Sequence, residues 1–278
     1  MNKWLYKIKE QFAPFNFALI PLLLWMVLTA CSSSNNQTTP EPKNVVFLIS
    51  KDPDNYEADR TIPAFAAQLE EKYNFNTEVL LSSGPRHASD FPDLSVLDQA
   101  DLLVVFCRRL ALPDRQLRQI QKYIEDGHPV MGIRTANHAF SVRDGTIPDG
   151  YSDWKDFVPV VLGCENRGYG PVEPGTDISV VSHLAGHTIL QGIEDSYWHS
   201  TGNVYKVAPL LDDKAIVYLR GSVGSARLDE PVAWTRINPY GGKVFYSSLG
   251  HPADFDNADN VKILNQAIAW LTHNSTKK

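Results

Sequence analysis

Two histidines and one aspartate follow apolar runs of the sequence, at positions where their side chains could transfer protons. His138 lies shortly after Val130–Ile133, and His251 and Asp254 lie shortly after Lys243–Ser248. The unperturbed pKa of histidine is near neutral, so an imidazole can act as a general acid or base. Asp254 could orient one imidazole. The same three side chains could instead bind a divalent metal such as zinc, but the spacing His251-x-x-Asp254 is too common to establish one.

Arginines and hydroxyl-bearing residues follow the same kind of run and favour oxygen-rich ligands. Arg108 and Arg134 could hold oxygen atoms or developing negative charge. The predicted catalytic residues are Arg134, His138, His251 and Asp254. The predicted substrate-binding residues are Asp54, Tyr56, Arg108, Arg109 and Thr135. Structural alternatives exist, because Asp54 and Thr135 could cap helices and surface arginines are often only solvated charges.

The elements that position these residues are predicted to form a parallel sheet covered by helices. Four short, β-branched runs without alternation are typical of strands buried on both faces: Val45–Ile49, Thr77–Leu81, Leu102–Phe106 and Val130–Ile133. Helical patterns at Pro63–Tyr73 and Pro113–Asp126 separate them, which predicts right-handed crossovers. Ligands of such sheets sit beyond the carboxyl ends of the strands. We therefore expect the polar residues to line one shared crevice.

After Gly150 the pattern changes to an added, partly antiparallel region. The expected strands are Asp177–Val181, Ser196–Tyr205, Ala215–Leu219, Pro231–Ile237 and Lys243–Ser248, and the expected helices are Trp154–Leu162 and Val261–Leu271. The aromatic residues Trp154, Tyr169 and Trp198 could stack on a ligand, although core packing is the ordinary role of such side chains. Residues 44–274 are predicted to form a single domain.

The first residues of the chain are typical of a lipoprotein signal. Lysines precede an apolar stretch that is short for a membrane span, and Leu28-Thr29-Ala30-Cys31 resembles a bacterial lipobox. Residues 1–30 are therefore predicted to be a signal peptide, with Cys31 as the lipidated N-terminus and residues 31–43 as a flexible tether. Ser32 resembles outer-membrane sorting. The expected location is the cell envelope, on the periplasmic face, with the membrane as partner through the lipid anchor.

Charge and cysteine usage narrow the partners further. The net charge of −6 argues against nucleic acid as a partner. Cys107 and Cys164 could form a disulfide in an oxidising compartment or remain buried and inert, and Cys107 adjoins an apolar strand, which favours burial.

Several stretches in a specific order make the chain similar to a known family. They are Ala100–Ile124, Met131–Phe140, Gly186–Ile193, Leu210–Leu219, Pro231–Thr235 and Lys243–Pro252. Together they resemble the ThuA-like, or trehalose-utilisation, family over residues 44–274. Gly132 to Phe140 resembles the branch with Gly-x-Arg-Thr-x-x-His-x-Phe. That branch often has a histidine in a later Gly-rich loop, where this chain has Asn166-Arg167-Gly168-Tyr169-Gly170.

The resemblance implies an α/β fold, flavodoxin-like or class I glutamine amidotransferase-like, in which helices flank a parallel sheet. Amidotransferases carry a Gly-x-Cys-x-Gly nucleophile turn and a later His-Pro-Glu. Here the turn is Gly132-Ile133-Arg134-Thr135-Ala136, and Ala253 follows His251-Pro252. Arginine cannot attack a carbonyl because its guanidinium stays protonated. Amidotransferase activity is therefore not expected.

Two classes of function remain open at this stage. The family link implies carbohydrate catabolism, acting on a trehalose-like disaccharide or keto-sugar, and the histidines would suit hydrolysis, isomerisation or epimerisation. Alternatively, the protein binds carbohydrate without turnover, as a module whose fold lacks the nucleophile of its relatives.

Overall fold

The computed structural model describes residues 41–224 and 226–273. The predicted signal peptide, the predicted lipidation site Cys31 and most of the predicted tether lie outside these residues. The prediction ends the tether at Lys43, whereas Lys43 is the first residue of the first strand. In the described part of the chain, no helix is both long and apolar enough to cross a membrane.

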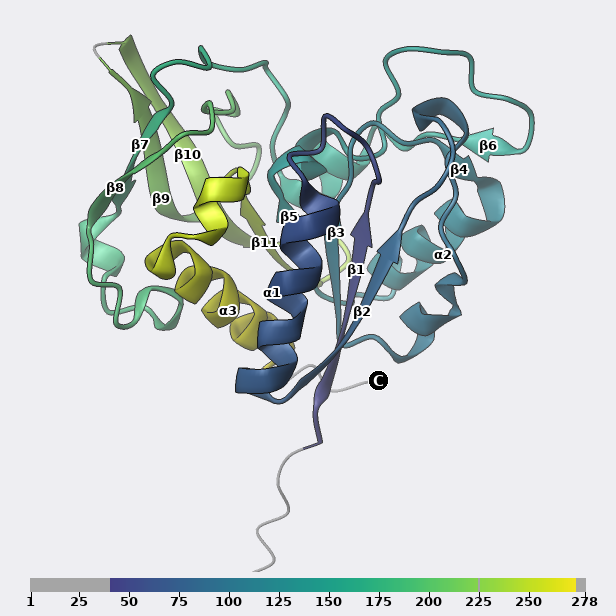
Figure 1. The fold of residues 1–278 in the computed structure, drawn as a ribbon, viewed down its shortest axis with the longest axis horizontal. Coiled ribbons are helices and arrows are strands. Elements are labelled where there is room, and N and C mark those ends of the chain that lie inside the picture. The colour runs from purple at the N-terminus through teal and green to yellow at the C-terminus, as the bar shows by residue number, and fades with distance from the viewer. Residues whose placement is uncertain (1–40, 225, 274–278) are drawn as a thin grey trace, which may run out of the picture. The chain divides into compact units, whose positions relative to one another are not determined.

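The described residues contain a nine-stranded sheet in the order β2-β1-β3-β5-β11-β10-β9-β7-β8 (Figure 1). Its parallel part is formed by β1 (Lys43–Ile49), β2 (Phe75–Leu81), β3 (Leu102–Phe106), β5 (Val130–Ile133) and β11 (Lys243–Ser247). Its antiparallel part is formed by β7 (Thr176–Val180), β8 (Tyr197–Ser200), β9 (Ile216–Val223) and β10 (Ala226–Ile237). The predicted parallel sheet with an added antiparallel region is thereby confirmed.

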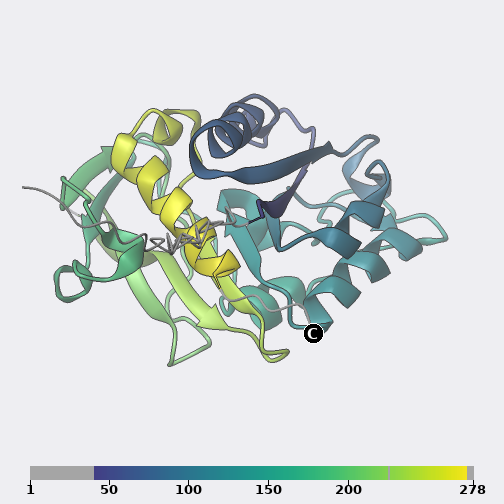
Figure 2. The same cartoon turned by 90° about the horizontal axis from the view of Figure 1, so that it is seen from below.

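Helices cover both faces of the parallel strands (Figures 1 and 2). One face packs against α1 (Ala58–Tyr73) and α3 (Ala258–Thr272), and the other packs against α2 (Asp114–Glu125) and η4 (Phe157–Leu162). Successive residues of β1 alternate between the two cores, which is why the strand is apolar throughout. Burial of each large apolar side chain contributes about 1.5–3 kcal/mol.

Shorter elements complete the fold around the sheet. A small second sheet pairs β4 (Leu112–Pro113) with β6 (Tyr151–Ser152). The short 3₁₀ helices are η1 (Arg86–Ala88), η2 (Leu94–Gln99), η3 (Arg134–His138), η5 (Ser182–Leu184), η6 (Thr188–Leu190) and η7 (Pro252–Phe255).

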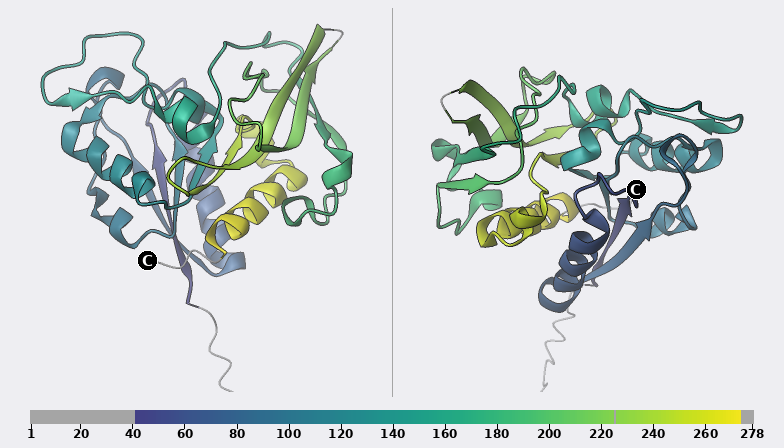
Figure 3. Two further views of the ribbon diagram at one scale, coloured as in Figure 1. Left: turned by 180° about the vertical axis from the view of Figure 1, so that it is seen from behind. Right: turned by 45° about the horizontal axis from the view of Figure 1, so that its top comes forward.

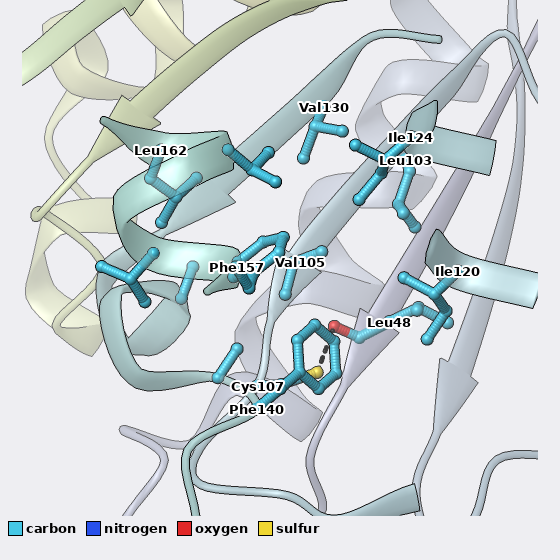
Figure 4. Close-up of a cluster of buried hydrophobic side chains, with 14 of the residues drawn as sticks. Leu48, Leu103, Val105, Cys107, Ile120, Ile124, Val130, Phe140, Phe157 and Leu162 are labelled. Carbon is cyan, nitrogen blue, oxygen red and sulfur yellow. Dashed lines mark hydrogen bonds between the residues drawn. The ribbon is translucent and has the colours of Figure 1, made fainter. Parts of the chain in front are cut away.

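Cys107 and Cys164, the cysteines among the described residues, are buried and free. Cys107 packs in the cluster beside α2 and donates a hydrogen bond from Sγ to the carbonyl oxygen of Leu48, at 3.2 Å (Figure 4). Burial raises the pKa of the Cys107 thiol well above its ordinary value, and burial raises that of Cys164 to about 12. The thiols therefore stay protonated at neutral pH, and the prediction of buried, inert cysteines is confirmed.

Several predicted boundaries are wrong for identifiable reasons. Helix α1 begins at Ala58 and includes Pro63, because the carbonyl to which Pro63 cannot donate belongs to the exposed Asp59, where water can bind it. The helix predicted at Trp154–Leu162 is restricted to Phe157–Leu162 and has π winding. The strand predicted at Ser196–Tyr205 stops at Ser200, because the backbone from Val204 to Lys206 instead pairs with the loop at 167–170.

Candidate functional site

The carboxyl ends of β1, β3, β5 and β11 meet at one edge of the sheet, at the top of Figure 1 and brought forward in the right panel of Figure 3. Backbone bonds join the segments that follow them: the N–H of Arg109 donates to the carbonyl of His138, at 3.0 Å. Most non-glycine residues with positive φ in the described chain lie here, with φ of 53° at Tyr56, 50° at Glu57, 57° at Arg109 and 43° at Arg134. Such backbone strain concentrates at functional sites.

A row of contacting side chains runs along this edge. The imidazole of His138 lies 6.0 Å from the ring of Tyr205, and the guanidinium carbon of Arg134 lies 4.9 Å from that same ring. The guanidinium carbon of Arg134 also lies 4.0 Å from the ring of Tyr56, whose centroid is 6.1 Å from that of His251. The predicted residues His138, Arg134, Tyr56 and His251 therefore gather at one edge, but the two imidazoles lie at opposite ends of the row.

Arg134 occupies the sharp turn between β5 and η3. Its φ of 43° gives this turn the strained strand-to-helix form of a nucleophile elbow. The residue packed against this turn has to be small, because a Cβ on Gly250 would come within 3.0 Å of the Cβ of Arg134. The elbow geometry expected from the amidotransferase-like fold is therefore present, with a cation at its tip.

The guanidinium of Arg134 is enclosed, with 1% of the residue exposed. Nη1 donates to the carbonyl of Ser248 at 2.9 Å, and Nη2 donates to Oδ1 of Asn203 at 3.0 Å. Among the described residues, no carboxylate forms an ion pair with it. The two flanking tyrosine rings stabilise the buried charge through cation–π interactions.

The phenol of Tyr56 is altered by this cation. Burial alone would raise its pKa, but the charge and hydrogen bond of Arg134, a hydrogen bond with Tyr205 and the charge of Arg108 together outweigh burial, so the pKa lies below its ordinary value of about 10. Tyr56 is only partly buried and can reach a ligand. It is therefore a stronger acid than an ordinary tyrosine.

His251 is half-buried, and its Nδ1 lies 2.9 Å from Oγ1 of Thr201. Burial and the charge of Arg134 lower its pKa, against the opposing charge of Asp254, so its imidazole is neutral at neutral pH. No hydrogen bond joins its Nε2 to another described residue. Nε2 is therefore free to accept a proton.

Asp254 positions His251 through the backbone. The Asp254 carboxylate accepts hydrogen bonds from the backbone N–H groups of Gly250 and His251, both at 2.8 Å, and from the hydroxyl of Ser200 at 2.6 Å. These bonds fix the start of η7, where His251 stands. The predicted link between this carboxylate and an imidazole ring is not among them.

His138 is almost fully enclosed, with 2% of the residue exposed. Nη1 of Arg108 lies 3.4 Å from Nε2, and Oδ1 of Asn137 lies 2.5 Å from Nδ1. Since arginine only donates, Nε2 carries the lone pair and Nδ1 carries the proton. Burial, with the charges of Arg109 and Arg108, holds the pKa of His138 well below its ordinary value.

This enclosed imidazole predicts acid sensitivity of the fold. The unfolded chain binds a proton at the ordinary histidine pKa of about 6.5, before folded His138 does, so the free energy of unfolding should fall as pH drops below that value. The expected slope is up to about 1.4 kcal/mol per pH unit, down to the folded-state pKa. Urea denaturation at neutral and mildly acidic pH should show a smaller loss for His138→Gln, whereas His183→Gln, an exposed control, should match the wild type. Equal losses in all three proteins would contradict the prediction.

The loop at 166–170 completes the enclosure of His138 despite lacking a histidine. Nδ2 of Asn166 lies 3.1 Å from Nδ1 of His138 and donates to the hydroxyl of Tyr169, also at 3.1 Å. Tyr169 is 36% exposed and packs edge-on against Tyr205 at 4.8 Å. Sequence reasoning did not select Asn166 or Tyr205. By contrast, Trp198 and most of Trp154 pack into the cores, as expected of ordinary aromatic residues.

Two other predicted binding residues have partners within the protein. Thr135 is fully buried, and its hydroxyl donates to Oδ1 of Asn55 at 2.6 Å, which ties η3 to the loop after β1. Asp54 is exposed and accepts from Nη2 of Arg86 at 2.7 Å, and Asp52 accepts from the same arginine. Thr135 is thus held away from the surface, whereas Asp54 lies exposed at the surface.

A divalent metal does not fit this arrangement of His138, His251 and Asp254. No group of three metal-binding side chains occurs in the described ranges 41–224 and 226–273. The oxygens of Asp254 face three N–H or O–H donors, and Nε2 of His138 faces the guanidinium of Arg108. A cation would have to displace donors and approach a positive charge.

Fold and site together define an α/β protein with an amidotransferase-like elbow that carries arginine in place of a nucleophile. The family model ThuA, described as trehalose utilisation, matches residues 45–271. The chain therefore belongs to the ThuA family, as the sequence motifs predicted. No curated protein matches the sequence.

Solved structures share the fold at low sequence identity. A ThuA-like protein from Bacteroides uniformis superposes with a TM-score of 0.59 at 13% identity, over 84% of this chain and 92% of that chain. A ThuA-like protein from Parabacteroides merdae gives a TM-score of 0.59 at 14% identity, over 85% and 93%. Agd3, a carbohydrate deacetylase, gives 0.53 at 15% identity, over 83% of this chain but 32% of that chain. These likenesses establish the fold.

Proposed function

We propose that the protein acts on a carbohydrate by acid–base chemistry centred on His251 and Tyr56. The observation that carries the proposal is the stacking of Tyr56 on the buried guanidinium of Arg134, at 4.0 Å, with His251 at the edge of the same ring. The imidazole of His251 is neutral and can accept a proton, and the phenol of Tyr56 is acidified and can donate one. The neutral imidazole of His251 and the protonated phenol of Tyr56 are both available at neutral pH.

Carbohydrate is supported as the ligand class by the relatives of the chain. The family model is described as trehalose utilisation, and the solved neighbour Agd3 is a carbohydrate deacetylase. Sugar hydroxyls are groups from which a neutral imidazole can remove a proton during hydrolysis, isomerisation or epimerisation. A trehalose-like disaccharide or a keto-sugar fits this chemistry.

The residues divide into distinct roles in this proposal. Nε2 of His251 takes a proton from a sugar hydroxyl, and the hydroxyl of Tyr56 gives a proton to the oxygen that gains negative charge. Arg134 stabilises the resulting phenolate from its position against the ring. His138 lies at the other end of the row and is enclosed, so His251 and Tyr56 replace the predicted pair of histidines as the groups that exchange protons with the substrate.

The cell envelope is the proposed location, and the sequence alone supports it. The apolar stretch before Leu28-Thr29-Ala30-Cys31 and the polar segment after it favour a lipid anchor on Cys31, with the folded part held near the membrane on its periplasmic face. An outer-membrane destination follows from Ser32 in the same way.

Carbohydrate binding without turnover is the second candidate. One observation favours it: the elbow, where amidotransferase-like enzymes place their nucleophile, carries the non-nucleophilic Arg134. Tyr169 would then offer an exposed ring to a sugar.

A substrate panel distinguishes the two candidates. The purified full chain is incubated with trehalose, other disaccharides and keto-sugars, with and without EDTA, while NMR follows products and calorimetry follows binding. We expect product formation that EDTA does not abolish, because the proton-transfer groups are protein side chains. Saturable binding without product would favour the binding module. The absence of both with every sugar would contradict both candidates.

A further inference from the structure

We propose that Arg108 and Arg109 form a subsite for an anionic substituent, a carboxylate or phosphate, on the carbohydrate ligand. This inference rests on the proposed carbohydrate function and adds the substrate class, an acidic sugar. The first observation is the unpaired positive charge of these two arginines. Among the described residues, neither arginine forms an ion pair with a carboxylate, although the chain has a net charge of −6.

Several other arginines of the described residues form ion pairs with carboxylates. Carboxylates pair with Arg86, Arg167, Arg220 and Arg236. Asp52, whose carboxylate interacts electrostatically with Arg108, and its neighbour Asp54 both accept hydrogen bonds from Arg86 and so are already engaged. The two adjacent arginines after β3 therefore leave positive charge at an edge where substrate is expected.

The backbone holds both arginines in place. The N–H of Arg108 donates to the hydroxyl of Ser50 at 2.9 Å, and the N–H of Arg109 donates to the carbonyl of His138 at 3.0 Å. Arg109 also adopts a left-handed φ of 57°, which costs free energy in a non-glycine residue. The strain and the bonds fix the backbone of both arginines beside His138.

The donors of these guanidinium groups are poorly used within the protein. Arg109 reaches the carbonyl of Ser141 and the hydroxyl of Tyr169, both at 3.4 Å, and Arg108 reaches Nε2 of His138, also at 3.4 Å. Charge-assisted bonds to an anion are shorter, at about 2.7–2.9 Å. In addition, Nε of each arginine is buried without a partner, which is rare for a polar atom. An incoming carboxylate or phosphate would supply the missing acceptors.

The position of the pair indicates recognition rather than reaction. Arg108 and Arg109 adjoin His138, whereas His251 lies at the opposite end of the row through Tyr205, Arg134 and Tyr56. An acidic group bound at the arginines would therefore lie beside His138, at the end of the row opposite His251. Loss of either arginine should weaken binding of the acidic sugar, or raise its KM.

Calorimetry on the full chain tests the subsite with four probes: D-glucuronate, its neutral methyl ester, D-glucose and inorganic phosphate. We expect glucuronate to bind about 10- to 100-fold more tightly than glucose or the ester, as charge-assisted bonds imply. Arg109→Gln and Arg108→Gln should each remove most of that preference. Arg118→Gln is the control, because Arg118 is an exposed arginine on α2. The ester comparison keeps the test valid if a variant does not fold.

The outcomes separate this inference from the function on which it rests. Equal binding of glucuronate, ester and glucose would overturn the subsite and leave the carbohydrate function standing. A preference for glucuronate that survives both arginine substitutions would also overturn it. Phosphate binding that depends on the arginines, with no binding of any sugar, would retain an anion site and reject the carbohydrate function. No binding of any probe would reject both.

Discussion

Replacing Arg134 by alanine is expected to lower the free energy of unfolding by about 2–4 kcal/mol and to abolish function. The substitution leaves a cavity between Tyr56 and Tyr205 and removes the donors to Ser248 and Asn203. Part of this loss is offset, because a cation that is buried without a carboxylate no longer has to be desolvated. Urea denaturation measures the change.

Arg134→Met separates the charge from the packing. Methionine fills most of the space, so its loss of stability should be smaller than that of alanine. The pKa of Tyr56 should nevertheless rise in both variants, because the guanidinium that lowers it is gone. Absorbance titration of tyrosinate, with Tyr56→Phe to assign the signal, reads this shift. A methionine variant that keeps both the low pKa and full activity would show that Arg134 only supports the fold.

The strained turn after β5 also determines what Arg134 can contact. It directs the side chain toward the rings of Tyr56 and Tyr205, and the guanidinium changes their acidity. Its effect is therefore electrostatic and acts through Tyr56. Gly202 makes room for it, because a Cβ there would lie 2.9 Å from Nη1.

The parallel half of the fold was predictable because strands that are buried on both faces consist of continuous runs of apolar, often β-branched residues. Strands β3 and β5 have the predicted bounds, and their carboxyl ends carry the predicted polar residues. The order in which helices and strands alternate then determines that these ends share one edge. This is why Arg134, His138 and His251 could be placed together from sequence.

The inner surface of the site was not predictable, because it depends on what packs over those ends. Tyr205 and Asn203 come from a segment whose apolar pattern resembles a strand, but whose backbone pairs with the loop that carries Asn166. Backbone pairing between two loops leaves no periodicity in side-chain type. That pairing encloses His138 and brings Tyr205 against Arg134. The sequence therefore showed which residues reach this edge of the sheet, but not which of them face solvent.

His251→Gln is expected to reduce turnover of the substrate by about 10²- to 10⁴-fold, the usual contribution of a general acid–base group. Glutamine retains the size of the side chain and a partner for Thr201, but it cannot exchange a proton at neutral pH. The free energy of unfolding should therefore change little, because His251 is only half-buried and Asp254 holds the backbone at this point. His183→Gln, at an exposed histidine, is the matched control and should retain wild-type turnover.

The pH dependence of the rate is a second test of the assignment of His251 as the base. As a base, His251 acts in its neutral form, so the wild-type rate should fall as acid protonates the imidazole. Because burial and Arg134 lower its pKa, that fall should lie below the ordinary histidine value of about 6.5. Residual activity in His251→Gln should lack this acid limb. A glutamine variant with the same acid limb and only a small loss of rate would assign the proton transfer to another group, of which Tyr56 is the nearest in the row.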